Sequence, residues 1–254
     1  MYVDAHAHFD DDIFSPERQT LIENMKKSGV DIIINSGFDV ESSKESIKLA
    51  EKYDFFYAGV GIHPEDSQKA KEEDILKIKE LTKHKKVVAI SEIGLDYHYE
   101  GYDKQVQKYF FEKQLLLAHE LDLPVVIHSR DAAEDTFEII KNSPVRKGMM
   151  HAYSYSPELA KEYLKLGFYI SAGGVVTFKN GKKLRNTVEQ TPIDRLITET
   201  DSPYMAPEPL RGSINNSSNI KYILSKIAEI KGLSEEETAL KIRNNMLKLF
   251  PKIQ

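Results

Sequence analysis

The sequence predicts a (β/α)8 barrel with one additional C-terminal helix, and three observations support this. Apolar runs of strand length alternate with amphipathic helical patterns, which is typical of a parallel sheet. Eight such units fit into 254 residues, and an α/β barrel of about 250 residues is commonly one domain, so 1–254 is expected to be a single domain. Histidine and aspartate, residue types that can bind metals, lie at the ends of the first and the last apolar run. Only a closed barrel brings those two ends together.

The strands are predicted from short runs rich in apolar residues, as expected for strands buried on both faces. In chain order they are Tyr2–His8, Asp31–Gly37, Phe55–His63, Val87–Gly94, Pro124–Arg130, Gly148–Tyr153, Phe168–Gly173 and Leu196–Asp201.

The helices are predicted from apolar residues at mixed three- and four-residue spacing. They are Glu17–Ser28, Val40–Tyr53, Asp74–His84, Gln105–Leu121, Ala132–Lys141, Pro157–Leu166, Gly181–Gln190 and Ile220–Ile230, followed by Glu235–Phe250. Start signals are Ser15 before Pro16, Ser156 before Pro157, and a capping box of Ser234 with Glu237; stop signals are Gly29 and Gly167.

Composition narrows the class of protein. Hydrophobic residues make up 41% and charged residues 30%, which is ordinary for a soluble globular chain. The absence of cysteine excludes disulfides and thiolate ligands. No apolar stretch approaches the roughly 20 residues of a membrane span, and the start shows no secretory signal, so a cytoplasmic protein is expected. The net charge of −5 argues against DNA binding through a basic surface, but it does not exclude a nuclease whose metal ions and local cations hold phosphates.

Six donors end the predicted strands, and this is the main functional signal. His6 and His8 are two residues apart, so they leave the same face of a strand. The other four are Glu92, His128, His151 and Asp201. A parallel barrel gathers the C-terminal ends of its strands on one face. The sequence therefore predicts a two-metal hydrolytic site of nitrogen and oxygen ligands.

Five of the donors also have a structural interpretation. His6 and His8 are compatible with one core and one surface histidine, His128 and His151 singly with core or rim histidines, and Glu92 with a buried salt bridge to Arg130. Asp96 is expected to fix a loop or support a ligand, and Asp4 either to orient an imidazole or to make a hydrogen bond within the barrel.

Further residues are candidates for substrate contact. His63 ends the third run, and Arg130 and Arg211 carry the planar fork that suits phosphate oxygens, although each is equally compatible with a structural role. A basic cluster could attract a polyanion or simply be a solvated helix entrance: Lys179, Lys182, Lys183 and Arg185. The remaining histidines, His84, His98 and His119, are expected to be structural or on the surface.

Seven motifs resemble the TatD-type metal-dependent deoxyribonucleases of the amidohydrolase-like barrel superfamily. They are HAHFD, GIHPED, SEIGLDYHY, LPVVIHSR, HAYS, TETDSPYMAP and the RG at Arg211, in that order. The resemblance implies a (β/α)8 barrel, two divalent metals and hydrolysis of DNA phosphodiesters, often as a 3′→5′ exonuclease. By matching motif, it implies that His6, His8 and Asp201 bind the first metal, that His128 and His151 bind the second, and that Glu92 bridges them.

The chain departs from the family's pattern at three places, which bear on substrate preference. The family usually has His-Cys-Phe-Ser where this chain has His151–Ser154, and often Ser-Phe-Ser-Gly at Ser171–Gly174. A Lys-X-Asn-Glu-Pro pattern is common where this chain has Ser213-Ile214-Asn215-Asn216-Ser217, so a basic and an acidic residue are replaced.

The expected function is a two-metal phosphodiesterase acting on DNA. Glu92 and Asp201 are the expected catalytic residues, with Asp201 accepting the proton of the attacking water. Zinc, manganese and magnesium all suit such a donor set. DNA contacts are expected mainly to the backbone, since no sequence-reading motif is present. One alternative is a hydrolase of esters, lactones or amides on the same barrel. Another is an inactive metal-binding scaffold, which the complete donor set disfavours.

Overall fold

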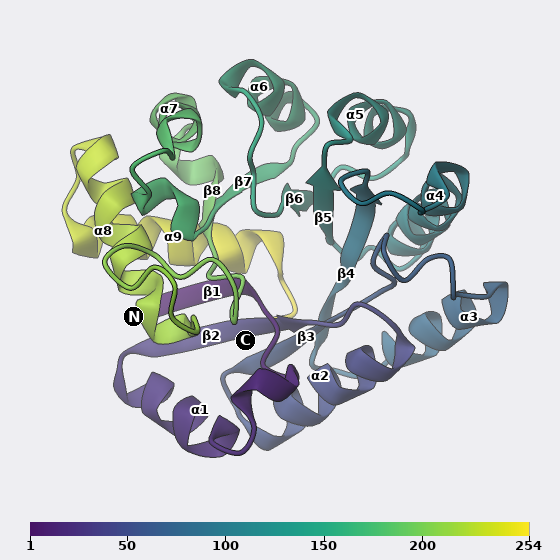
Figure 1. Cartoon of the computed structure of the whole chain (residues 1–254), viewed down its shortest axis with the longest axis horizontal. Helices are drawn as coiled ribbons and strands as arrows, with labels where there is room; N and C mark the ends of the chain where they lie inside the picture. The colour runs from purple at the N-terminus through teal and green to yellow at the C-terminus, as the bar shows by residue number, and fades with distance from the viewer. Residues whose placement is uncertain (254) are drawn as a thin grey trace.

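The computed structural model describes residues 1–253, and it confirms the predicted (β/α)8 barrel. The strands form one parallel sheet in chain order from β1 to β8 (Figure 1). They are β1 Tyr2–Ala7, β2 Val30–Ser36, β3 Phe56–Val60, β4 Val87–Asp96, β5 Val125–Arg130, β6 Gly148–Met150, β7 Tyr169–Ala172 and β8 Leu196–Thr198.

The α-helices surround the sheet (Figure 1). They are α1 Arg18–Lys27, α2 Val40–Lys52, α3 Glu72–Leu81, α4 Lys104–Glu120, α5 Ala133–Asn142, α6 Pro157–Lys165, α7 Lys182–Gln190, α8 Ile220–Lys231 and α9 Glu235–Leu249. Short 3-10 helices are η1 Asp12–Phe14, η2 Gly174–Thr177, η3 Ile193–Arg195 and η4 Ser217–Asn219. The additional helix α9 packs against β1 and β8. None of the helices within residues 1–253 is long and apolar enough to cross a membrane.

The barrel is nearly closed where β8 meets β1. Ala7 and Ser202 form a parallel bridge beyond the end of β8. The backbone N–H of Asp201 donates to His6 O at 3.0 Å, and that of His8 donates to Ser202 O at 2.7 Å. These bonds place Asp201 beside His6 and His8, as predicted from the need to close the barrel.

Three strands end three residues earlier than expected, and their donor side chains lie on the loops that follow. β3 ends at Val60, β6 at Met150 and β8 at Thr198, so His63, His151 and Asp201 lie on loops just after their strands. Ala152 and Asp201 have φ values of +41° and +56°, which no strand allows. In the opposite direction, β4 continues to Asp96 because it pairs with β5 to the end of that strand.

The predicted helix signals were mostly right. The Ser156 hydroxyl accepts the Leu159 N–H, and the Ser234 hydroxyl accepts the Glu237 N–H, so both cap their helices. The expectation for Ser15 was wrong, because α1 begins only at Arg18 and Ser15 ends the preceding 3-10 helix.

The core fills the barrel and the layer between barrel and helices. Ile33, Val60, Ile90, Ile127 and Ile170, from five different strands, are all fully buried. Burying such side chains stabilises the fold by roughly 1.5–3 kcal/mol each. The apolar layer forms the rigid base on which the polar residues at the strand ends are held.

One close approach between strands requires glycine. Gly94 on β4 pairs with His128 on β5 and has a φ of +145°. A Cβ atom at Gly94 would lie 1.9 Å from His128 O, which no real side chain tolerates. The missing side chain therefore allows β4 to bring Glu92 close to His128.

Candidate metal centre

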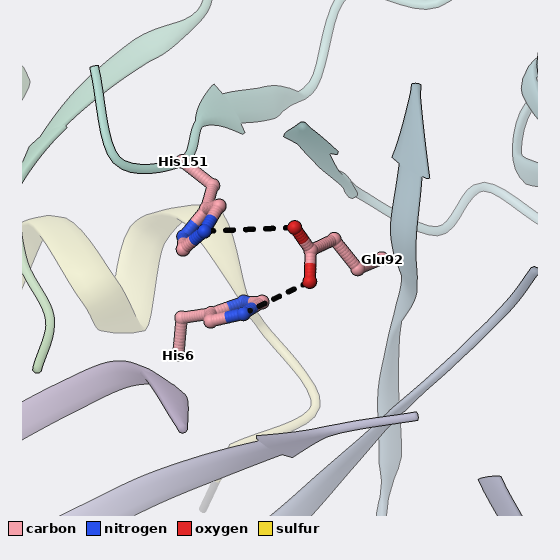
Figure 2. A group of neighbouring side chains, drawn as sticks. All are labelled: His6, Glu92 and His151. Atoms are coloured by element: carbon pink, nitrogen blue, oxygen red, sulfur yellow. Dashed lines mark ion pairs between the residues drawn. The ribbon is translucent and has the colours of Figure 1, made fainter. Parts of the chain in front are cut away.

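The six predicted donors converge at the C-terminal ends of the strands. His6 lies in β1 and His8 just after it, Glu92 lies in β4, His128 in β5, His151 just after β6 and Asp201 beyond β8. Figure 2 shows the rings of His6 and His151 directed toward the carboxylate of Glu92 from separate parts of the barrel. His6 is fully buried, and Glu92 is only 4% exposed.

The two carboxylate oxygens of Glu92 contact different pairs of histidines. Oε2 lies 3.2 Å from His6 Nε2 and 3.6 Å from His8 Nε2. Oε1 lies 2.8 Å from His128 Nδ1 and 3.5 Å from His151 Nε2. A carboxylate placed between two pairs of nitrogen donors has the geometry of a bridging ligand.

Asp201 contributes the second carboxylate and is more accessible than the other acidic donor. Its Oδ1 lies 3.8 Å from the Nε2 atoms of both His6 and His8 and 3.9 Å from His151 Nε2. Its side chain is 19% exposed, against 5% for Glu92. The φ of +56° is one that aspartate tolerates better than most residues, and strained positions of this kind are frequent at functional sites.

Ser36, at the end of β2, holds both histidines of β1. His6 Nδ1 lies 3.0 Å from Ser36 Oγ, and His8 Nδ1 donates to the backbone oxygen of Ser36 at 2.9 Å. The Nε2 atoms therefore face each other across 3.0 Å. Ser91 Oγ donates to Ser36 Oγ and so connects this pair to the residue preceding Glu92.

Carboxylates hold the other two imidazoles. His151 Nδ1 donates to Glu199 Oε2 at 2.9 Å, and His128 Nε2 donates to Asp96 Oδ2 at 2.8 Å. A carboxylate that accepts from one ring nitrogen orients the ring and frees the other nitrogen for a metal. Asp96 thus has the supporting position that the sequence predicted for it.

The charged groups of the site shift each other's pKa values, and positive charge is favoured at His151 and His128. Burial alone would raise the pKa of Glu92, but the surrounding imidazoles, first His6 and His151, hold that pKa well below its usual value. Burial likewise opposes charge on His151, but Glu199 and Glu92 outweigh it and raise the pKa of His151 to about 10. Asp96 and Glu92 similarly raise the pKa of His128 to about 9.

The donor set suits divalent metals. Imidazole nitrogens and carboxylate oxygens form three groups whose ligand atoms lie within 4.8 Å of one another: His6, His8 and Asp201; His6, Glu92 and His151; and His63, Glu92 and His128. The first group matches the set expected for the first metal. His151 lies nearer to His6 than to His128, with ring centroids 3.7 Å and 6.2 Å apart, which differs from the expected pairing of His128 with His151.

His63 lies beside Glu92, and the hydrogen bond at its Nδ1 indicates that Nε2 is a hydrogen-bond donor. Its Nδ1 accepts the Glu65 N–H at 3.2 Å, so the neutral ring carries its proton on Nε2, 3.7 Å from Glu92 Oε1. Burial lowers the pKa of His63 to about 3, which keeps the ring neutral. The Nε2–H is therefore available to an acceptor in the site.

The arginine side chains that were predicted to contact substrate or attract a polyanion lie outside the cluster of histidines and carboxylates. Arg130 is exposed, with its guanidinium 5.3 Å from the centre of the Tyr99 ring, and it forms no salt bridge with Glu92, so the alternative of a Glu92–Arg130 salt bridge is wrong. The guanidinium of Arg211 lies 4.3 Å from the Phe178 ring. Arg185 donates to the backbone oxygens of Val176, Phe178 and Lys179, so it fixes the loop before α7 rather than facing a polyanion.

Asp4 and the 213–217 segment hold the loop that carries Asp201. The Asp4 carboxylate accepts from the Thr200 N–H at 2.8 Å and from the Ser217 hydroxyl, so it makes a barrel hydrogen bond and does not orient an imidazole. The Asn215 amide donates to Thr200 O at 2.9 Å and Tyr204 O at 2.8 Å. The segment that departs from the family's pattern therefore supports Asp201 from both sides.

Sequence reasoning missed Ser36 and Glu199. Glu199 is two residues before Asp201 in an apolar run, a spacing that could have indicated a second carboxylate on the same face. Ser36 gives no signal in one sequence, because its role depends on its neighbour in β1. Outside the centre, His84 pairs with Glu51 and His98 with Asp131 near the surface, as expected for structural histidines.

Comparison with known proteins places the chain among metal-dependent hydrolases. A family model described as TatD related DNase matches residues 3–251. The uncharacterized metal-dependent hydrolase YabD of Bacillus subtilis (strain 168) is 43% identical over 252 residues, which covers 98% of this chain and 99% of that protein. The uncharacterized metal-dependent hydrolase MJ1582 of Methanocaldococcus jannaschii is 38% identical over 254 residues and covers 99% of this chain and 97% of its own length.

A solved structure supports the same family relationship. The crystal structure of YjjV, described as a TatD homolog from Escherichia coli K12, superposes with a TM-score of 0.93 at 30% identity and covers 98% of each chain.

Proposed function

The chain belongs to the TatD related DNase family of metal-dependent hydrolases, and from that premise we propose that it cleaves DNA phosphodiester bonds at a two-metal centre, as a 3′→5′ exonuclease. One observation is the main support for a metal centre. Each of four imidazoles has one ring nitrogen held by Ser36, Asp96 or Glu199, and its other nitrogen is directed to Glu92. Four imidazole nitrogens within 3.6 Å of one buried carboxylate, each on a ring held at its other nitrogen, favour metal binding.

We assign the donors as the family resemblance implies. His6, His8 and Asp201 would hold the first cation, His128 and His151 the second, and Glu92 would bridge both. The His151 ring is 3.7 Å from the His6 ring, so in this assignment His151 lies beside the first set of ligands while binding the second cation. Bound divalent cations would polarise the phosphoryl group and lower the pKa of a water molecule.

Asp201 is the proposed general base. Its side chain is 19% exposed, so one carboxylate oxygen can face both the centre and the substrate. That oxygen would take the proton of the attacking water, and the same carboxylic acid could deliver a proton to the leaving 3′-oxygen. His63 would donate its Nε2–H to a phosphoryl oxygen, because its Nδ1 is engaged by Glu65 N–H.

Substrate binding is proposed to rely on the phosphate backbone. Arg130 ends β5 on the same side of the barrel as the centre and is exposed. Lys179, Lys182 and Lys183 are exposed at the entrance to α7 and add positive charge to a chain of net charge −5. Contacts of this kind hold nucleic acid without reading its sequence.

The test is nucleotide release from an end-labelled single-stranded DNA oligonucleotide. Wild-type protein and Glu92→Ala would be compared with Mg²⁺, Mn²⁺ or Zn²⁺ and with EDTA. We expect metal-dependent ladders that EDTA and the substitution abolish, and a 5′ label should yield a series of products shortened from the 3′ end.

No cleavage with any of the three metals, despite metal bound to the protein, would contradict the nuclease assignment. The same preparations would then be assayed with aryl esters, lactones and amides, because the fold and the donor set serve those hydrolyses equally well. Metal-dependent turnover of one of these substrates would identify the alternative hydrolase.

A further inference from the structure

Glu199 occupies a fully buried position directly behind His151. Its Oε2 accepts from His151 Nδ1 at 2.9 Å, and its Oε1 accepts from the backbone N–H of Ala152 at 2.6 Å. The two oxygens thus accept one hydrogen bond each, from two consecutive residues of the loop that follows β6. Ala152 has a φ of +41°, so Glu199 fixes an unusual turn as well as a ring.

An ionised carboxylate offers two acceptors and no donor. Next to Glu199, His151 must therefore carry a proton on Nδ1, which leaves Nε2 to face Glu92 Oε1 at 3.5 Å and His6 at the centre. A ring free to turn or to exchange tautomers would present an N–H to the centre for part of the time. An N–H cannot bind a cation.

We propose that Glu199 is a positioning residue that holds His151 in the orientation and tautomer required of a metal ligand. The proposal rests on the metal centre of the proposed function, to which Glu199 contributes no ligand atom. It acts through His151 and the turn at Ala152, from the position directly after β8, so the end of β8 would support the centre with two carboxylates of different roles.

The variant Glu199→Gln tests this because the amide is nearly isosteric but has a single acceptor oxygen. It cannot accept from both Ala152 N–H and His151 Nδ1–H. If its oxygen stays on Ala152 N–H, its NH2 group faces His151 Nδ1 and favours the tautomer protonated on Nε2. Loss of a partner of this type commonly weakens metal affinity by about 10–100-fold.

Two readouts are needed, and neither is activity. The first is Zn²⁺ and Mn²⁺ affinity by competition with a chelator, where we expect one of two ions to bind about 10–100-fold more weakly in Glu199→Gln. The second is the Nδ1–H resonance of His151 in protein with ¹⁵N-labelled histidine, assigned by its loss in His151→Gln. We expect a downfield, slowly exchanging proton in the wild type and its loss in Glu199→Gln.

Asp4→Asn is the matched control, since Asp4 is an equally buried barrel carboxylate whose bonds go to Thr200, Ser217 and a backbone N–H rather than to an imidazole. Its unfolding free energy shows what neutralising a buried carboxylate does by itself, and it should retain the His151 resonance. Wild-type metal affinity in Glu199→Gln, or an unchanged His151 resonance, would overturn the proposal. Wild-type protein that binds no metal would instead overturn the proposed centre, while the resonance still decides the role of Glu199.

Discussion

The Nε2 atoms of His6 and His8 lie 3.0 Å apart, and Ser36 contacts the opposite nitrogen of both rings. Their spacing of two residues in β1 places both rings on one face, and Ser36 turns them toward one point. Two imidazole lone pairs at that distance repel unless a cation or a proton lies between them. A neutral tautomer of one ring can supply that proton, and a divalent cation can take its place, so Ser36 holds the two nitrogens where they can share either one.

A metal ion should accordingly stabilise the fold. An ion that binds only the native state raises the free energy of unfolding by about 2.7 kcal/mol when its concentration is 100 times its dissociation constant. We expect the melting temperature to rise when Zn²⁺, Mn²⁺ or Mg²⁺ is added to EDTA-treated protein, measured by calorimetry.

The control for metal stabilisation is Glu92→Gln, which keeps the shape of the proposed bridge but removes its charge. This variant should show a much smaller rise than the wild type. A melting temperature that is the same with and without every ion would contradict the metal centre.

Gly94→Ala should destabilise the protein strongly. The new Cβ would lie 1.9 Å from His128 O, at a φ of +145° that is nearly restricted to glycine. Either β4 and β5 separate or the backbone deforms. We expect the free energy of unfolding, measured in urea, to fall by more than about 3 kcal/mol.

The control for this steric effect is Gly101→Ala. Gly101 also has a positive φ, +93°, but a Cβ there meets no atom within 4 Å. The free energy of unfolding of Gly101→Ala should fall by only about 1 kcal/mol, which is the cost of the backbone conformation alone. Equal losses in the two variants would show that the contact with His128 is not what requires glycine.

Sequence alone predicted the barrel and the convergence of the six side chains because both depend on local patterns. Strand-end positions in a parallel sheet converge whatever the details of the register, so His6 and Asp201 were predicted to meet across the whole chain. The supporting residues depend on which side chains face each other across strands. Ser36 and Glu199 were missed for that reason, and the early end of β6 depends on the φ of Ala152, which no residue pattern indicates.

Asp201→Asn should lower turnover sharply while preserving the fold. Asparagine is nearly isosteric and tolerates the φ of +56°, but a neutral amide does not accept the proton of a water molecule. General-base catalysis typically contributes about 10²–10⁴-fold, so we expect kcat on a DNA oligonucleotide to fall by that order at saturating metal.

Metal content and unfolding free energy should be measured on the same Asp201→Asn preparation, because the carboxylate is also a proposed ligand. A fall in kcat that is restored by raising the metal concentration would assign Asp201 to metal binding alone. Near-normal turnover would remove it from both roles.

Arg130→Ala should weaken the binding of DNA without affecting the chemical step. Arg130 ends β5 beside the centre and is exposed, and its guanidinium lies over the Tyr99 ring and donates to Tyr99 OH at 3.5 Å. If it holds a phosphate, its loss should raise KM for single-stranded DNA with kcat nearly unchanged. The slope of log KM against log salt concentration should also fall by roughly 0.7, the value for one phosphate contact on a single strand.

Arg195→Ala is the matched control for this prediction. Arg195 has the same type of contact, with its guanidinium 5.2 Å from the Tyr169 ring, but it precedes β8 and so lies at the opposite end of the barrel. Any loss of stability from breaking an arginine–tyrosine contact should appear in both variants, whereas the change in KM and in its salt dependence should appear only in Arg130→Ala. Equal kinetic effects in the two variants would mean that Arg130 at the end of β5 does not contact the DNA backbone.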